Sequence, residues 1–485
     1  LVLAPLSAPD EVSHYISAYE LSNRFLGLPG TDEDGYIYIR AEDDWIEDVN
    51  QEFRDWKEKS EQESLNGENG ETEAGKPIIL GQTLKEETYV AIHNRRAVSE
   101  QSAEPSADSE STKESTSTGD SIGMDSSVKT AGLRVSRQPS VRTTPLAYMP
   151  QALGFTLARI LGLNSIALLY LGRFLNLLLF AAVGVLTIKR LPFGKNVSIL
   201  PMSLHLAASL SYDVVILAFT GYFTAVCLDL AYKADTVKVK DVIALAVVMA
   251  VMGPCKMVYG AIAGFCLLIP VKKFGNWGKW TVSAAVVLGS FLAAMAVVNL
   301  RTVAMYTQES DSYVAWAEEA GYSFAELLHQ PVRVLQLFYN TVAWQGESLY
   351  SGMLGESLGN RDAVLNTPYV VILLLTACLV ILVLKKPGEE IFMKIKERLW
   401  IWFICLVIFA ALMFSMLLAW TPKSSNMVQG VQGRYMLPLL PVLLLTLKNQ
   451  KVVRTGTDDR LVLYTMMAAD VYVILRIFAV VCLRL

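Results

Sequence analysis

The residues best suited to chemistry lie near the start of the chain, in the run Ser7-Ala8-Pro9-Asp10-Glu11-Val12-Ser13-His14. Pro9 suits the first turn of a helix, and Asp10 and Glu11 stand where carboxylates complement the helix dipole. His14 follows Asp10 by four residues and therefore shares its helical face. Two interpretations stay open: a plain helix start, or a carboxylate that acts as a general base or binds a divalent cation such as Mg²⁺ or Mn²⁺.

Other charged residues stand in or beside apolar runs, where a charge is costly and often functional. Asp213 is either an interfacial cap or a functional acid, and Lys256 either extends to the membrane surface or contacts a lipid phosphate. Arg434 follows Gly433, which permits close backbone approach, so its guanidinium could bind two phosphate oxygens or anchor a helix entry. Arg173, inside an apolar run, is expected to be a structural ion-pair partner for an acid such as Asp213.

The composition indicates that these residues belong to a membrane protein. The chain has 485 residues, of which 53% are hydrophobic and 18% are charged, whereas soluble proteins carry about a quarter charged residues. Residues 1–145 are polar and acidic, and residues 146–485 hold long apolar runs separated by short charged connections. The Walker, GxGxxG, HExxH and GxSxG motifs are absent and no CxxC pair occurs, which argues against a soluble enzyme or a zinc site. We expect the lipid bilayer, and no nucleic acid, as a partner.

Ten apolar runs are candidates for membrane-spanning helices, which need about 20 mostly apolar residues. Seven of them are long: Ile166–Ile188, Tyr212–Tyr232, Thr281–Leu300, Tyr369–Leu384, Leu399–Trp420, Met436–Leu447 and Leu461–Leu483. Three are shorter and have polar or kinking neighbours, which favours helices packed inside the bundle or ending at a cavity: Val197–Leu210, Val242–Gly253 and Met257–Val271. The predicted fold is therefore an all-α, multi-pass membrane bundle.

Basic residues predict how this bundle lies in a cell membrane. They gather in five connections, at residues 189–195, 233–240, 272–279, 385–398 and 448–460. These connections alternate with basic-poor ones if all ten runs span, and basic connections face the cytoplasm. Residues 1–145, 301–365 and 421–434 are then expected on the extracytoplasmic side. Because Leu1–Leu6 resembles the end of an apolar segment, we expect a missing first helix, and eleven spans, in the intact protein.

The two longest outward segments differ in character. Ser99–Ser127 is dominated by Ser, Thr, Glu and Asp with almost no large apolar residue, so we expect it to be disordered. Residues 301–365 are expected to include an amphipathic helix near Phe324–Trp344 that lies on the outer surface. The aromatic residues of this segment form either an interfacial belt or a groove for an acceptor sugar.

Six short motifs follow one another along nearly the whole chain. They are Ala8-Pro9-Asp10-Glu11-Val12-Ser13-His14-Tyr15, Pro145-Leu146-Ala147-Tyr148-Met149-Pro150-Gln151, Leu200-Pro201, Ser209-Leu210-Ser211-Tyr212-Asp213, Lys256-Met257-Val258-Tyr259 and Gln432-Gly433-Arg434-Tyr435-Met436-Leu437-Pro438. Their order and spacing resemble the GT-C superfamily of polytopic membrane glycosyltransferases, and most closely a bacterial family of uncharacterised membrane proteins placed in that clan. Residues 42–144 look like a long insertion, because the first loop of that family is usually tighter.

The resemblance implies a GT-C-like bundle of ten or eleven helices whose first outward loop carries the acidic motif. It also implies a polyprenyl-phosphate-linked sugar donor, and a cell-surface polysaccharide, teichoic acid or glycolipid as acceptor. Asp10 is then the base, and Glu11 is its partner or a ligand of the divalent cation. The residues expected to bind the substrates are His14, Tyr148, Gln151, Asp213, Lys256, Tyr259, Gln432, Arg434 and Tyr435.

Two other functions stay open. A lipid or polysaccharide transporter predicts functional charges in mid-membrane and symmetry between the two halves of the chain. A non-enzymatic scaffold of an envelope-assembly complex predicts loss of function when Glu42–Thr144 is deleted, and tolerance of Asp10→Asn. An enzyme predicts the reverse.

Overall fold

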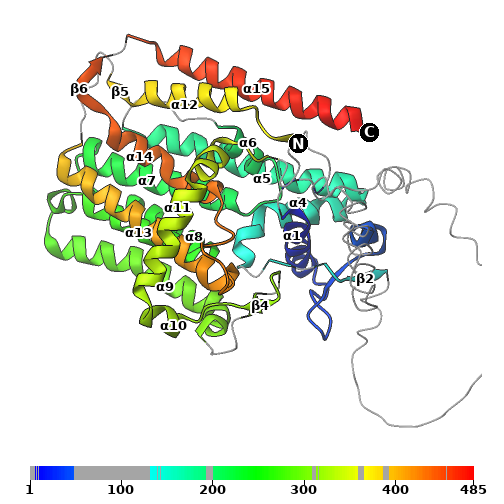
Figure 1. Cartoon of the computed structure of the whole chain (residues 1–485). Coiled ribbons are helices and arrows are strands. Elements are labelled where there is room, and N and C mark those ends of the chain that lie inside the picture. Colours follow the sequence, from blue (N-terminus) through cyan, green and yellow to red (C-terminus); the bar gives the residue numbers. More distant parts are fainter. Residues whose placement is uncertain are drawn as a thin grey trace, which may run out of the picture.

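The computed structural model describes most of the chain, as residues 6, 8, 10–48, 132–138, 140, 141, 144–192, 200–307, 313, 314, 316–358, 365–385, 393–454 and 456–484. The predicted disordered segment Ser99–Ser127 lies outside the described residues, as do Ser7 and Pro9 of the acidic motif. Helices dominate the described part, and its three sheets have two strands each. The prediction of a helical membrane protein is confirmed (Figure 1).

Among the described residues, five helices are long and apolar enough to cross a membrane. They are α5 (Ser165–Arg190), α7 (Asp213–Leu228) with its π-helical extension η3 (Asp229–Lys233), α9 (Trp277–Thr307), α13 (Ile395–Trp420) and α15 (Asp459–Arg484). Shorter apolar helices lie among them: α8 (Val239–Cys255), η4 (Met257–Leu268), α12 (Tyr369–Val383), η7 (Gly433–Leu439) and α14 (Leu440–Leu447). A helix of 26 residues, such as α5, is about 39 Å long, which exceeds the roughly 30 Å hydrocarbon core of a bilayer.

The run Val197–Leu210 differs from the other predicted spans. Its described part holds α6 (Pro201–Ala207), whose seven residues are about 10 Å long, a third of the hydrocarbon core. This short helix packs against α5, α7 and α11 (Pro331–Leu354), which agrees with a helix packed inside the bundle. The count of ten or eleven spans stays a prediction.

The five basic connections meet at one end of the bundle. A chain of contacts joins them: Arg190 with Asp229 and Asp241, Lys273 with the carbonyls of Ala231 and Ala234, Tyr232 with Glu397, Arg398 with the Thr446 carbonyl, and β5 (Leu384–Lys385) with β6 (Asn449–Arg454). Figure 1 shows β5 and β6 at this end, opposite the N-terminal helix α1. The grouping agrees with the charge pattern from which the orientation was predicted, while the orientation itself stays a prediction.

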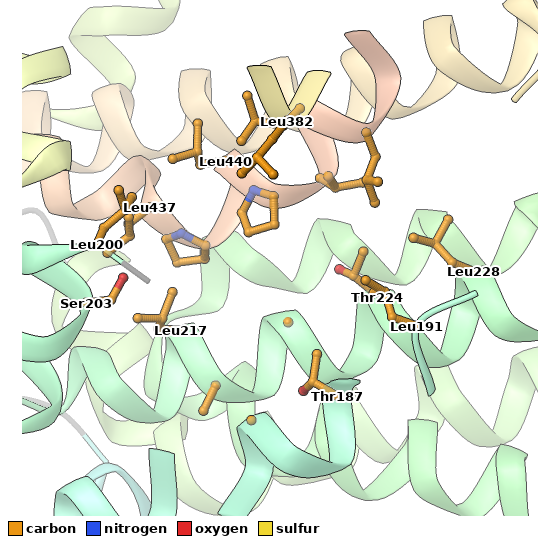
Figure 2. Close-up of a pocket in the computed structure, with 18 of the residues that line it drawn as sticks. Thr187, Leu191, Leu200, Ser203, Leu217, Thr224, Leu228, Leu382, Leu437 and Leu440 are labelled. Carbon is orange, nitrogen blue, oxygen red and sulfur yellow. The ribbon is translucent and has the colours of Figure 1, made fainter. Parts of the chain in front are cut away.

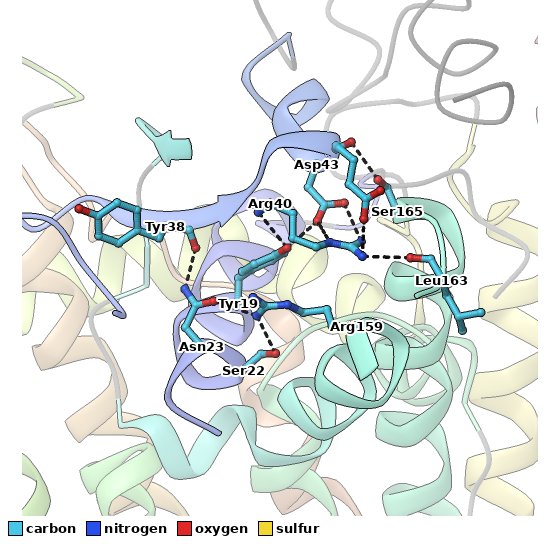
Figure 3. Close-up of polar contacts among 10 residues, drawn as sticks. Tyr19, Ser22, Asn23, Tyr38, Arg40, Asp43, Arg159, Leu163 and Ser165 are labelled. Carbon is cyan, nitrogen blue, oxygen red and sulfur yellow. Dashed lines mark hydrogen bonds and ion pairs between the residues drawn. The ribbon is translucent and has the colours of Figure 1, made fainter. Parts of the chain in front are cut away.

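The described elements that precede α5 form a small cap on the bundle. Its elements are α1 (Glu11–Phe25), β1 (Ile37–Arg40), η1 (Ala41–Asp48), β2 (Leu133–Ser136), η2 (Pro145–Tyr148) and α4 (Met149–Ile160). The carboxylate of Asp43 accepts hydrogen bonds from Tyr19 Oη at 2.5 Å and from Arg40 Nε at 2.7 Å, and Arg159 donates to Asn23 Oδ1 at 2.8 Å (Figure 3). Because η1 contacts α1 and β2 pairs with β1, the described edges of the predicted 42–144 insertion belong to the folded cap.

The predicted amphipathic helix on the outer segment forms as two pieces. The helix α10 (Phe324–His329) ends at Gln330, and α11 begins at Pro331, which cannot continue the hydrogen bonding of a helix. An exposed apolar stripe runs along them with helical spacing, through Leu328, Val332, Leu335, Tyr339 and Val342. The strands β3 (Tyr313–Val314) and β4 (Glu319–Ala320) precede it. This face suits the interfacial region of a membrane.

Candidate functional site

A cluster of four charged side chains lies at the end of the bundle opposite the basic connections. Asp10 precedes α1, Asp213 begins α7, Lys256 follows α8, and Arg434 lies in the first turn of η7. The fold therefore collects onto one site four segments that are as much as 424 residues apart in sequence. All four residues were among those predicted from the sequence.

Ion pairs link the members of this charged cluster in a row. Arg434 Nη2 donates to Asp10 Oδ2 at 2.8 Å, and Arg434 Nε lies 3.4 Å from Asp213 Oδ2. Lys256 Nζ lies 3.9 Å from Asp213 Oδ1 and 3.6 Å from the centre of the Tyr435 ring, a distance typical of a cation–π contact. Two carboxylates and two cations thus balance each other.

Asp10 is the accessible member of the charged cluster. Its side chain is 56% exposed, whereas those of Arg434, Asp213 and Lys256 are 6%, 11% and 13% exposed. Its backbone has φ 58°, in the left-handed region that Asp tolerates better than most residues. A molecule that reaches this end of the bundle would contact the Asp10 carboxylate before the two nearly buried cations.

Close backbone packing holds Arg434 in place. A Cβ atom at Gly433 would lie 2.1 Å from the Leu349 carbonyl oxygen and 2.5 Å from the Met353 nitrogen, so only glycine fits against α11 at this position. The hydroxyl of Tyr259 donates to the carbonyl of Tyr435, which fixes the next residue of η7. The sequence interpretation of Gly433 as a point of close approach agrees with this geometry.

Glu11 has a different environment from its neighbour Asp10. It is fully buried, and the Arg173 guanidinium binds it through Nε at 2.8 Å and Nη2 at 2.5 Å. The backbone nitrogens of Leu210 and Ala8 also donate to its carboxylate. Burial alone would raise the pKa of Glu11, but the Arg173 charge and these hydrogen bonds outweigh it and lower the pKa.

These contacts give Glu11 a structural role, because its carboxylate is fully used in joining α1 to α5 and to the connection before α7. The expected partner of Arg173 was an acid such as Asp213. Arg173 pairs instead with Glu11, 162 positions away in sequence. Helix α1 places Glu11 towards α5, and the sequence alone does not specify that direction.

The buried side chain of His14 lies in an aromatic pocket. Its Nδ1 is 2.7 Å from the Tyr148 hydroxyl, and its ring contacts Tyr212 edge-on at 5.5 Å between centroids. Burial lowers the pKa of His14 to about 4, despite the opposing charge of Asp10. The imidazole is therefore neutral near pH 7 and acts as a hydrogen-bonding partner of Tyr148, not as a charge.

Gln151 and Gln432 complete the predicted set. The Gln151 side chain donates to the carbonyls of Leu210 and Ser211, so it positions the connection that leads into Asp213. Gln432 precedes η7, where its carbonyl accepts from the backbone nitrogen of Tyr435. Asn176, which the sequence reading missed, binds the same connection through the carbonyls of Ser209 and Ser211.

The side chains of the acidic motif do not fit a divalent cation. No group of three His, Cys, Asp or Glu side chains in the described part of the chain lies close enough together to hold a metal ion. Glu11 is committed to Arg173, and both Asp10 and Asp213 already face cations that would repel a metal.

One buried acid lies far from this cluster. Asp470 of α15 is only 4% exposed, and neither of its carboxylate oxygens has a hydrogen-bond partner among the described residues. The sequence signal was present, since Asp470 interrupts the apolar run Leu461–Leu483.

The five long apolar helices and the charged cluster at one end define a multi-pass helical membrane protein. The family model described as predicted membrane protein (DUF2142) matches residues 1–443, and the chain belongs to this family. No curated protein and no solved structure matches the chain.

Proposed function

We propose that this protein is a membrane glycosyltransferase that moves a sugar from a polyprenyl-phosphate-linked donor to a glycan or lipid acceptor outside the membrane. Asp10 is the general base, and Arg434 and Lys256 bind the donor phosphate. The observation that carries the proposal is the pairing of the exposed Asp10 carboxylate with the nearly buried Arg434, beside a second nearly buried cation, Lys256, at the end of the bundle opposite the basic connections.

The cations suit a phosphate group on a lipid carrier. The Arg434 fork can hold two phosphate oxygens, and Lys256 adds a second positive charge at the same place. In the free protein, Asp10 accepts a hydrogen bond of 2.8 Å from Arg434 Nη2. A donor phosphate competes for this hydrogen bond, which releases the Asp10 carboxylate to accept a proton.

The transfer step balances with these groups alone. An acceptor hydroxyl oxygen attacks the anomeric carbon of the donor sugar, and its proton passes to Asp10. The bond between the anomeric carbon and the phosphate oxygen breaks, and its electron pair stays on the polyprenyl phosphate. Arg434 and Lys256 stabilise that negative charge, and attack from the side opposite the leaving group inverts the sugar.

The test compares sugar transfer by wild type and Asp10→Asn, using purified full-length protein, polyprenyl-phosphate-linked sugars and a cell-envelope acceptor fraction. Loss of a general base lowers rates by about 10²–10⁴-fold. Asp34→Asn is the matched control, because Asp34 is an exposed carboxylate in a turn of the same outward segment.

The outcomes separate the hypotheses. Loss of transfer in Asp10→Asn alone, with unchanged thermal unfolding, supports the enzyme and its base. Equal transfer in both variants would remove Asp10 from the mechanism. Absence of transfer from wild type with every donor tried would contradict the transferase and favour the envelope scaffold.

One observation favours a transporter as the second candidate. Asp470 is a buried acid without a hydrogen-bond partner among the described residues, inside a helix long enough to span the membrane. A transporter predicts that Asp470→Asn stops lipid or polysaccharide movement in proteoliposomes while Asp10→Asn does not. The glycosyltransferase predicts that product formation depends on Asp10 and tolerates Asp470→Asn.

A further inference from the structure

An apolar cavity of about 170 Å³ lies between α5, α7, α12 and the η7–α14 segment. Figure 2 shows Leu200, Ser203 and Leu437 at one end of it and Leu191 and Leu228 at the other. Leucine is the commonest residue in its lining, and no member of the charged cluster contributes to it. Pockets with a predominantly apolar lining accept apolar groups.

The length of the cavity matches one leaflet of a bilayer. Its lining on α7 runs from Leu217 to Leu228, which is about 16 Å at 1.5 Å per residue. Half of a 30 Å hydrocarbon core is about 15 Å. An acyl chain that lies along the cavity would therefore stay within a single leaflet.

Small residues leave room for such a chain. A Cβ atom at Gly184 would meet no atom within 4 Å, and one at Gly221 would meet only Thr187 Cγ2, at 4.0 Å. Both glycines line the cavity, one on α5 and the other on α7. The space is thus bounded by two helices that could have filled it with larger side chains.

A positive charge marks one end of the cavity. Lys448, the C-cap of α14, lines it at the end of the bundle where the five basic connections meet. Basic sites between membrane helices at such an end attract anionic lipid headgroups. At the opposite end of the bundle, the negative charges of Asp10 and Asp213 balance the positive charges of Lys256 and Arg434. The charge therefore selects the Lys448 end for a phosphate.

We propose that this cavity binds an anionic glycerophospholipid from the leaflet that faces the basic end. Part of one acyl chain lies in the space between α5, α7, α12 and α14, and the lipid phosphate meets Lys448. The bound lipid fastens α12, which packs mainly on α14 and α15, to the α5–α7 part of the bundle. This site lies outside the transfer chemistry and does not depend on it.

The test is native mass spectrometry of the purified full-length protein with phosphatidylglycerol and phosphatidylcholine that carry the same acyl chains. We expect wild type to prefer phosphatidylglycerol by about fivefold, the effect of one lysine worth about 1 kcal/mol near a lipid surface. Lys448→Gln removes the preference between headgroups. Gly221→Leu fills the cavity and removes the tightly bound lipid, and Gly289→Leu, an equally open glycine on α9, retains it.

Thermal unfolding of each variant checks folding, and Gly184→Leu replaces Gly221→Leu if the latter fails to fold. Equal retention of both phospholipids by wild type would overturn the proposal. So would retention of phosphatidylglycerol by both cavity-filling variants, or its displacement by polyprenyl phosphate at equal concentration.

Discussion

Replacing Glu11 by Gln tests the structural role of the more deeply buried acid of the motif. Glu11 and Arg173 are 0% and 1% exposed, and two hydrogen bonds join them. The amide keeps the shape of the carboxylate but not its charge, so Arg173 becomes an uncompensated buried cation. Breaking a buried ion pair on one side costs about 3–5 kcal/mol, and we expect that loss in the free energy of unfolding.

The assay is unfolding of the detergent-solubilised protein in a double-mutant cycle of Glu11→Gln with Arg173→Met. The double variant should lose less unfolding free energy than the two single variants together, by at least about 1 kcal/mol. Each single change leaves the other group buried without its ion-pair partner. Glu20→Gln, on the same helix, is the control. Glu20 pairs with Arg24 at the surface, and such a pair contributes about 0–1 kcal/mol.

The pH dependence gives a second readout. Since the folded pKa of Glu11 is lowered below its ordinary value of 4.5, its contribution to stability is fully present above about pH 4.5. That contribution is lost as the pH falls towards the folded pKa, and Glu11→Gln should remove this part of the acid sensitivity. The reasoning is refuted if Glu11→Gln costs no more than Glu20→Gln, or if it stops sugar transfer while unfolding is unchanged.

Three further predictions concern neighbouring residues. His14 has a folded pKa of about 4, so stability should fall as the pH drops from about 6.5 towards 4, and His14→Gln should flatten that part of an unfolding-versus-pH curve. Gly433→Ala should destabilise the protein by about 1–3 kcal/mol in thermal unfolding, because its Cβ would overlap backbone atoms, whereas Gly289→Ala should not. Arg434→Gln should raise the KM for the lipid-linked donor by about 10–150-fold, the effect of losing charged hydrogen bonds worth about 1.5–3 kcal/mol; an unchanged KM would remove Arg434 from donor binding.

Local composition was enough to predict the membrane elements. The predicted span from Tyr369 starts where α12 starts, and the predicted end at Trp420 is the end of α13. These boundaries can be predicted because a helix in lipid must satisfy its backbone hydrogen bonds internally and match a fixed apolar thickness. The run Val197–Leu210 was harder to interpret, since a short apolar run suits either a crossing or a buried helix.

The sequence also identified the residues of the charged cluster, but it did not show which of them pair. Asp10 and Arg434 stood out because charges beside apolar runs are costly, and Gly433 because it allows close approach. Nothing within either segment specified a 2.8 Å contact across 424 positions. Such pairings depend on how the helix ends are brought together, which is a property of the whole bundle.

Asp10 and Glu11 show most clearly what the sequence determines and what the tertiary structure decides. By sequence they are equivalent neighbouring acids at a helix start, yet the side chain of Asp10 is 56% exposed and that of Glu11 is fully buried. Asp10 precedes α1 with a left-handed backbone, whereas Glu11 is the first residue of α1 and binds Arg173 of α5. The sequence determined a membrane bundle with an acidic motif at its rim, whereas the packing of α1 against α5 decided which acid became accessible and which became a structural ion pair.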